Sequence, residues 1–157
     1  MIDLTSDEYF MGEALREAAK AFESGEVPVG AVVVLNNRII ARAHNQVEML
    51  KDATAHAEVL AITQASTALS NWRLQDTVLY VSKEPCFMCS GAILNSRVKR
   101  VVFGARDEKS GGAGSAMNIL QDPRQNHCVE VTAGVMEEPA RTLLLEFFKI
   151  QRSKYKG

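Results

Sequence analysis

The stretch "VGAVVVLNNRIIARAHN", residues 29–45, decides the fold class. Two apolar runs flank Asn36 and Asn37, and asparagine tolerates the left-handed backbone conformation that a tight two-residue turn needs. The stretch therefore predicts a β-hairpin. Whatever follows it along the chain must complete a sheet around these two strands.

Helices and strands alternate after the hairpin. The residue pattern predicts two helices, at 54–69 and 86–96, and three strands, at 77–82, 99–105 and 129–134. A closing helix is predicted from about 137 to 154. A hairpin followed by such an alternation implies a mixed sheet covered by helices. We therefore predict a three-layer α/β/α sandwich whose mixed sheet has about five strands.

The first helix, predicted at 6–24, is marked at both of its ends. Thr5 and Glu8 have the spacing of a capping box, in which two side chains satisfy the free amides at a helix start. An apolar stripe then runs from Phe10 to Phe22, and Gly25 follows as a stop signal.

Length and composition favour one globular domain covering residues 1–157, because no repeat, low-complexity segment or long linker divides the chain. No apolar run approaches the ~20 residues that span a bilayer. The N-terminus lacks the basic and apolar regions of a signal peptide, so we expect no membrane association and a cytoplasmic location. Three cysteines, an odd number, argue against a disulfide scaffold.

Charge is distributed unevenly along a chain whose net charge is only −1. Residues 1–30 hold seven acidic and two basic side chains, whereas residues 141–157 hold five basic and one acidic. A basic C-terminal end could contact a polyanion. The same charges could instead complement the dipole at the end of a helix, and charge alone does not decide between the two.

The stretch "KEPCFMC", residues 83–89, carries a pair of cysteines just after a predicted strand. Cys86 and Cys89 are three residues apart, so their thiols share one face of a helix, and a helix N-terminus favours the thiolate form. Such a pair serves either as a redox dithiol or as half of a metal site.

A catalytic zinc site needs a third protein ligand and an open position for water. The chain offers His44, His56 and His127. His56 also begins a helix after a strand, so the two helix starts can point to one place beside the sheet. Glu58, two residues further on, is suited to act as the general acid/base beside the open position.

Two motifs carry a family resemblance. "HAE" (56–58) with "PCFMC" (85–89) matches the H-x-E and P-C-x-x-C signature of the zinc-dependent cytidine and adenosine deaminases. Further stretches resemble the bacterial tRNA-specific adenosine deaminases over nearly the whole chain. They are "EVPVGAVVV" (26–34), "LYVSKEPCFMCSGAI" (79–93), "SRVKRVVFGARDEKSGGAGS" (96–115) and "FFKIQR" (147–152).

The resemblance implies a cytidine deaminase-like fold and one Zn²⁺ per chain on His56, Cys86 and Cys89. Glu58 would then be the catalytic acid/base. The implied reaction is hydrolytic deamination of adenosine to inosine at the wobble position of a tRNA anticodon, and the implied partners are the anticodon stem-loop and a second copy in a homodimer.

The resemblance also implies substrate contacts. Asn45 would hydrogen-bond the purine edge, and the Ala57 amide would hold the oxygen at C6. Four further positions would contact the flanking nucleotides: Asp107, Lys109, Phe148 and Arg152. Phe147 and Phe148 are adjacent on a predicted amphipathic helix, so we expect one of them to belong to the core.

Two positions depart from the family pattern, which commonly has Pro at Ala53 and an apolar residue at Lys83. Neither is an expected ligand. Two alternatives remain open at this point. One is a deaminase of a free nucleobase or nucleotide, which would share the zinc site. The other is a protein without deaminase activity, either a thiol redox protein or a zinc-stabilised binding module.

Overall fold

The predicted hairpin forms one edge of the sheet. In the computed structural model, which describes residues 3–155, β1 (Gly30–Leu35) pairs antiparallel with β2 (Arg38–His44). Asn36 and Asn37 join them with positive φ angles of 50° and 62°. Both residues thus adopt the left-handed conformation that this turn requires, and the hairpin prediction is confirmed.

The sheet is mixed and has five strands in the order β2-β1-β3-β4-β5. β1 runs antiparallel to both β2 and β3 (Val78–Lys83). β3, β4 (Arg100–Ala105) and β5 (Glu130–Thr132) are parallel to one another. Helix α4 (Phe87–Asn95) forms the crossover between β3 and β4, whereas an irregular loop, residues 106–129, connects β4 to β5.

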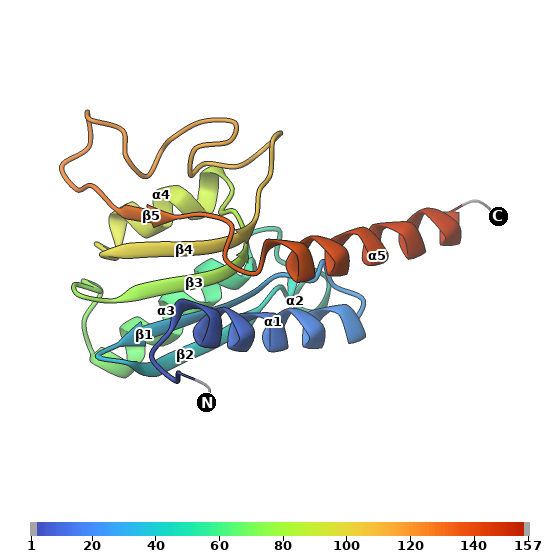
Figure 1. Ribbon diagram of the computed structural model, residues 1–157, viewed down its shortest axis with the longest axis horizontal. Coiled ribbons are helices and arrows are strands. Elements are labelled where there is room, and N and C mark those ends of the chain that lie inside the picture. Colours follow the sequence, from blue (N-terminus) through green and yellow to red (C-terminus); the bar gives the residue numbers. More distant parts are fainter. Residues whose placement is uncertain (1–2, 156–157) are drawn as a thin grey trace.

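Helices cover both faces of this sheet (Figure 1). Val32 of β1 packs in a cluster with Phe10 of α1 (Asp7–Glu23), whereas its neighbour Val33 packs in a cluster with Ala61 of α3 (Ala57–Leu69). Because successive strand residues point to opposite faces, α1 and α3 lie on opposite sides of the sheet. The predicted three-layer α/β/α sandwich is therefore confirmed.

The start of α1 differs from the prediction. Ser6 is the N-cap, and its hydroxyl accepts a hydrogen bond from the Tyr9 amide at 3.1 Å. The hydroxyl of Thr5 donates instead to the Asp3 carboxylate at 2.6 Å. The predicted capping box is therefore wrong, because Asp3 engages the threonine outside the helix. The expected stop is present, since Gly25 has a φ of 76° just after the helix ends.

Two helix starts are placed alike in space and backbone conformation. His56 is the N-cap of α3 and Cys86 is the N-cap of α4 (Phe87–Asn95), both with extended backbone. The predicted helices at 54–69 and 86–96 therefore begin slightly later than expected, and His56 precedes the first turn. Both side chains thus stand at the open end of a helix.

A short helix, α2 (Val47–Leu50), was not predicted. The amides of Glu48 and Met49 at its start donate to the two carboxylate oxygens of Glu26, at 3.0 and 2.8 Å. Glu26 is buried and lies 22 residues earlier in the chain. A local sequence pattern cannot predict this cap, because the capping carboxylate is distant in the sequence.

The C-terminal helix α5 (Glu137–Tyr155) extends beyond the sheet (Figure 1). Its first half packs against the sheet through the buried residues Ala140 and Leu144. Phe147 contacts Phe22 of α1, with 6.1 Å between ring centroids. No helix among residues 3–155 combines the length and the apolar character needed to cross a membrane.

Candidate active site

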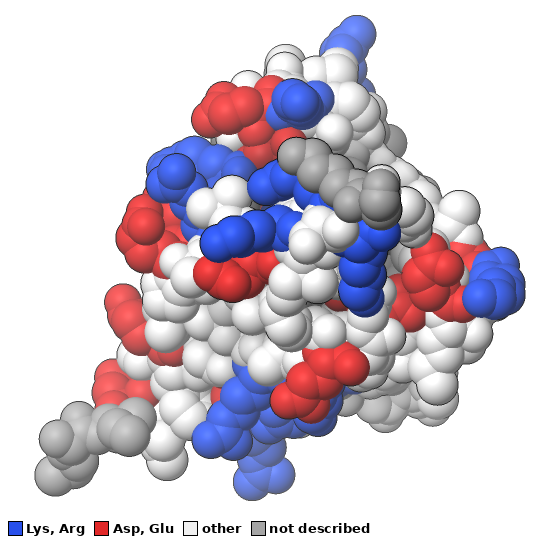
Figure 2. Space-filling model, turned by 90° about the vertical axis from the view of Figure 1, so that its right-hand side faces the viewer, with Lys and Arg blue, Asp and Glu red and all other residues white. Residues whose placement is uncertain are grey.

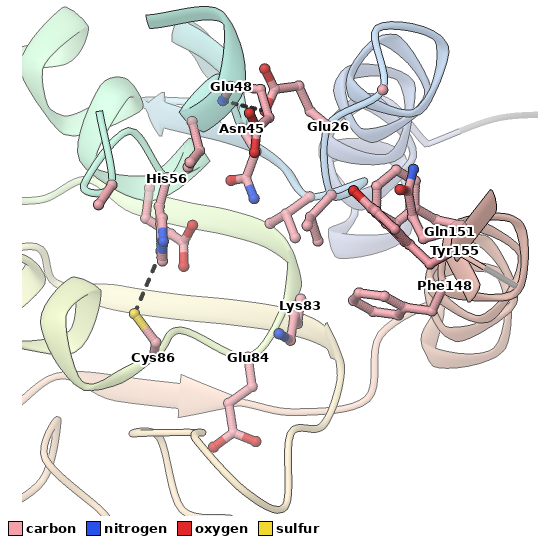
Figure 3. Close-up of a pocket in the computed structure, with 17 residues that line it drawn as sticks. Glu26, Asn45, Glu48, His56, Lys83, Glu84, Cys86, Phe148, Gln151 and Tyr155 are labelled. Atoms are coloured by element: carbon pink, nitrogen blue, oxygen red, sulfur yellow. Dashed lines mark hydrogen bonds between the residues drawn. The ribbon is translucent and has the colours of Figure 1, made fainter. Parts of the chain in front are cut away.

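Three side chains converge where α3 and α4 begin. The Nδ1 atom of His56 lies 3.6 Å from the sulfur of Cys86 and 3.5 Å from the sulfur of Cys89. All three potential ligand atoms lie within 4.8 Å of one another. Figure 3 shows the imidazole and the Cys86 sulfur facing each other. The structure thus brings together the three residues that the sequence nominated.

These distances fit a zinc ion. Typical bond lengths of about 2.0–2.1 Å to nitrogen and 2.3 Å to sulfur, at the tetrahedral angle, separate the nitrogen and sulfur ligands by about 3.6 Å. The observed separations of 3.6 and 3.5 Å agree with that value. One ring nitrogen that lies equally near two sulfurs is the arrangement expected for three ligands of a single metal ion. The donor set can therefore hold a metal.

The electrostatics of the three groups are linked. Hydrogen bonds from Cys89 and His56 lower the pKa of the Cys86 thiol to about 4. The same bond to Cys86, together with burial, raises the pKa of Cys89 well above its usual range. The bond to Cys86 also raises the pKa of His56. Cys86 is thus the thiol of the pair that loses its proton more readily.

Glu58 lies beside this group. It is in the first turn of α3, its exposed fraction is 3%, and its carboxyl lines the same cavity as His56 and Cys86. Burial raises the pKa of this carboxyl to about 7. The arrangement places a buried carboxyl next to the metal ligands without making it one of them.

The two other histidines are occupied elsewhere. His44 Nδ1 lies 3.4 Å from a carboxylate oxygen of Glu17, and His127 Nε2 lies 2.7 Å from the carbonyl oxygen of Val98. Neither belongs to the His56 group. Cys128 is exposed. Of the three candidate ligands, the structure therefore retains His56.

Asn45 is fixed by a hydrogen bond to the start of α3. Its side-chain oxygen accepts from the Ala57 amide at 2.7 Å, and the residue is 7% exposed. Figure 3 shows the Asn45 side chain at the cavity near His56. The amide expected to hold a substrate oxygen is therefore engaged by the residue expected to contact the purine, so the two roles are coupled.

A cavity of about 610 Å³ joins these groups to α5. One wall consists of Glu26, Glu48 and Asn45, and the opposite wall consists of Phe148, Gln151 and Tyr155 of α5 (Figure 3). The volume lies in the range that accommodates small organic molecules. The cavity can thus hold one base with room for adjoining groups.

The two adjacent phenylalanines of α5 divide between core and surface. Phe147 is 7% exposed, whereas Phe148 is 40% exposed. Both residues line the cavity, and their rings pack edge to face with 5.5 Å between centroids. Arg152, one turn further on, is exposed and does not line the cavity. Basic and acidic side chains are interspersed on the face toward which α5 points (Figure 2).

Asp107 and Lys109 lie at the start of the loop that follows β4. One oxygen of Asp107 accepts from the amides of Lys109 and Ser110, each at 3.1 Å. The other oxygen lies 3.1 Å from the ammonium nitrogen of Lys83. Lys109 itself is exposed. Neither Asp107 nor Lys109 lines the cavity, so they stand outside the group formed by His56 and Glu58.

A buried carboxylate that the sequence reasoning missed anchors this loop. Glu84 is 2% exposed and accepts from the amides of Asp107, Ala113 and Ser115 at 3.0 to 3.1 Å, and from the Ser115 hydroxyl. Gly111 packs so closely on the carboxylate that a Cβ would collide with it. An acidic residue at the end of a buried strand, directly before Pro85 and the cysteines, is the signal that could have found it.

The chain is similar in sequence to known deaminases. The sequence profile of the MafB19-like deaminases matches residues 5–152. The tRNA-specific adenosine deaminase of Bacillus subtilis is 53% identical over 154 residues, covering 98% of this chain and 96% of that protein. The protein of the same name from Aquifex aeolicus is 53% identical over 146 residues, covering 93% and 96%.

Solved structures are also similar. One, from a study of A-to-I editing by tRNA:A34 deaminases at the wobble position of transfer RNA, has a TM-score of 0.84 and 43% identity. It is matched over 87% of this chain and 99% of that chain. The guanine deaminase from Nitrosomonas europaea has a TM-score of 0.79 and 26% identity, over 91% of this chain and 85% of the other.

Proposed function

The chain belongs to the MafB19-like deaminases and, among them, to the tRNA-specific adenosine deaminases, and on this basis we propose that it hydrolyses adenosine to inosine at the wobble position of a tRNA anticodon. The observation that carries the proposal is the group of His56, Cys86 and Cys89 with Glu58 in the same cavity. One imidazole, two thiols and an adjacent buried carboxyl are the parts that hydrolytic deamination needs.

His56, Cys86 and Cys89 would hold one zinc ion per chain. Nδ1 is the ligating nitrogen, because it is the ring atom near both sulfurs. Bound zinc supplies a Lewis acid that lowers the pKa of water toward neutrality. Three protein ligands leave a fourth position open, as a catalytic site requires.

Glu58 would move the protons of the reaction. Its carboxylate takes a proton from the attacking water and gives it to N1 of adenine, which makes C6 electrophilic. After the water oxygen has bonded to C6, Glu58 takes the remaining proton of that oxygen and passes it to the departing amine. The C6–N6 bond breaks, so adenosine and water become inosine and ammonia.

Asn45 and Ala57 would position the base. In the structure the Ala57 amide donates to the Asn45 oxygen at 2.7 Å. A substrate oxygen at C6 must therefore share this amide with Asn45. The side-chain NH₂ of Asn45 remains available as a donor to the purine edge. One contact thereby orients the base while the other stabilises the developing charge.

An RNA loop would deliver the base. C6 of adenine is hidden in a stacked helix, and an anticodon loop presents unstacked bases at low energetic cost. Phe148, which lines the cavity and is partly exposed, would stack on a neighbouring base. Asp107, Lys109 and Arg152 would contact flanking nucleotides around the cavity mouth.

Residues 1–157 would act as a single deaminase domain in the cytoplasm. The active form would be a homodimer, for which α4 offers the small, partly exposed residues Gly91 and Ala92. Ile93 and Leu94 on the same helix are buried in the core and are not available for such a contact. The described residues already contain the metal-binding group, so no ligand from a partner is needed to form it.

Ammonia release tests the proposed function. The parent chain is incubated with an anticodon stem-loop and, separately, with free adenosine, cytidine and guanine. We expect release from the stem-loop alone. Release from a free base would favour a small-molecule deaminase, for which the similarity to the guanine deaminase and the size of the cavity are the arguments.

Metal analysis accompanies this measurement. We expect one zinc per chain, lost in His56→Ala and kept in His44→Ala, because His44 lies against Glu17 and outside the metal group. A chain that binds no zinc and cycles between dithiol and disulfide would contradict the proposal.

A further inference from the structure

Lys83 lies at the end of β3, immediately before the Glu84-Pro85-Cys86 segment, and its side chain faces the cavity (Figure 3). Among the described residues it is the only Lys or Arg that lines the cavity. The lining also contains four carboxyl groups, those of Glu26, Glu48, Glu58 and Glu84. The site that we propose binds a polyanion thus has one cation in its wall.

The only ion pair that Lys83 forms within residues 3–155 is with Asp107. The ammonium nitrogen lies 3.1 Å from one Asp107 oxygen, and the side chains are 31% and 17% exposed. Asp107 does not depend on this pair, because its other oxygen accepts two backbone amides and its own amide donates to Glu84. Lys83 can therefore exchange its partner without loosening the loop.

Lysine is suited to such an exchange. Its ammonium group sits on a flexible four-carbon chain and carries three donors, so it binds phosphate as a point charge without a fixed geometry. Both side chains keep some contact with solvent, which weakens the ion pair, so the lysine can leave it at low cost. A phosphate that enters the cavity mouth replaces one anionic partner by another.

We propose that Lys83 binds a backbone phosphate next to the target adenosine, and that Asp107 holds the lysine in place until RNA arrives. The proposal rests on the proposed function, since a free base brings no phosphate. A nucleotide whose base enters the cavity carries a phosphate on each side of its ribose, at the cavity mouth.

The first test compares two charge removals. In Lys83→Met the stem of the side chain is kept and the charge is lost. In Arg106→Met the same charge is lost from an exposed ion pair with Glu137, at 2.9 Å, outside the cavity. Stem-loop affinity is measured against salt concentration. We expect the slope for Lys83→Met to fall by ~0.7, which is roughly a 2.6-fold change between 50 and 200 mM salt, and the slope for Arg106→Met to match the parent.

The second test separates phosphate binding from the ion pair. Lys83→Met is introduced into an Asp107→Asn background, in which the pair is already broken. If Lys83 contacts a phosphate, the affinity still falls and the slope still flattens. If Lys83 serves only Asp107, the second substitution changes nothing, and the proposal is overturned. Lys83→Arg, which keeps a cation that can reach phosphate, is expected to restore the parent slope.

The outcomes distinguish this proposal from the proposed function. A parent chain that deaminates the stem-loop, together with a Lys83→Met variant of unchanged slope, overturns the role of Lys83 alone. A parent chain that does not act on the stem-loop overturns both. Zinc content and thermal melting of each variant, expected to equal the parent values, exclude a general loss of folding as the cause.

Discussion

The metal-binding group and the α5 side of the cavity are built in opposite ways. His56 and Cys86 stand on the N-caps of two helices that pack in the core, and Cys89 and Glu58 are buried in the first turns. Phe148, by contrast, stands 40% exposed on a helix that extends past the sheet. The metal-binding side chains are thus positioned by helix N-termini in the core. The side chains that would contact a large substrate lie instead on one face of an extended helix.

This difference predicts different responses to substitution. Changes at the metal-binding end should affect the chemical step with little effect on RNA affinity. Changes on α5 should affect affinity with little effect on metal content. A metal-site variant with weakened RNA affinity, or an α5 variant with reduced metal content, would contradict this division.

The largest effect is expected from Glu58→Gln. The amide fills the same buried space but cannot shuttle a proton, so turnover should fall by ~10² to 10⁴-fold while zinc and the fold are kept. Single-turnover deamination of the stem-loop measures it. Glu17→Gln is the matched control, because Glu17 is similarly buried, at 4% exposure, but lies outside the cavity. Near-normal turnover in Glu58→Gln would remove the assigned role.

An intermediate effect is expected from the adjacent phenylalanines, which serve as controls for each other. Phe147→Ala should lower the free energy of unfolding by about 3 kcal/mol, because the ring is buried against Phe22. Phe148→Ala should leave unfolding near the parent value and weaken stem-loop binding by ~1 to 3 kcal/mol through lost stacking. Denaturant unfolding and RNA titration measure the two. Identical responses would mean that the exposed ring has no separate role.

The smallest effect is expected from a chain ending at Gln151. This chain lacks Arg152 and Lys154, and also Lys156, which lies outside the described residues. Each lost phosphate contact should reduce the salt dependence of stem-loop affinity by ~0.7 to 0.9 in slope. If these residues only complement the helix dipole, the truncation costs a few tenths to about 1 kcal/mol of stability and leaves the slope unchanged. Equal slopes would therefore remove the tail as an RNA contact.

Sequence reasoning succeeded where a single segment carries its own signal. The turn at Asn36 and Asn37 and the cysteine spacing of Cys86 and Cys89 are local patterns, and each is found as expected. Of the three histidines, the sequence favoured His56 as the third ligand because it begins a helix and matches the family motif. The geometry agrees, because the other two histidines contact groups elsewhere.

Sequence reasoning failed where the partner of a group is distant or competes with it. Glu26 caps α2 from 22 residues away, and Glu84 holds amides 23 to 31 residues ahead of it. No periodicity reports such pairs, because they form only after the sheet has brought the segments together. At the start of α1, the Thr5 hydroxyl donates to Asp3, and Ser6 caps the helix in place of Thr5.

The carboxylate of Glu84 has a consequence for local opening of the molecule. The loop after β4 has little regular structure, yet three of its amides, spread from Asp107 to Ser115, end on this one buried group. Amide hydrogens in irregular loops usually exchange with solvent individually and fast. Here the amide hydrogens of Asp107, Ala113 and Ser115 can exchange only when their hydrogen bonds to the Glu84 carboxylate break. They should therefore exchange slowly and at a common rate, so that a segment resembling a coil opens as one cooperative unit.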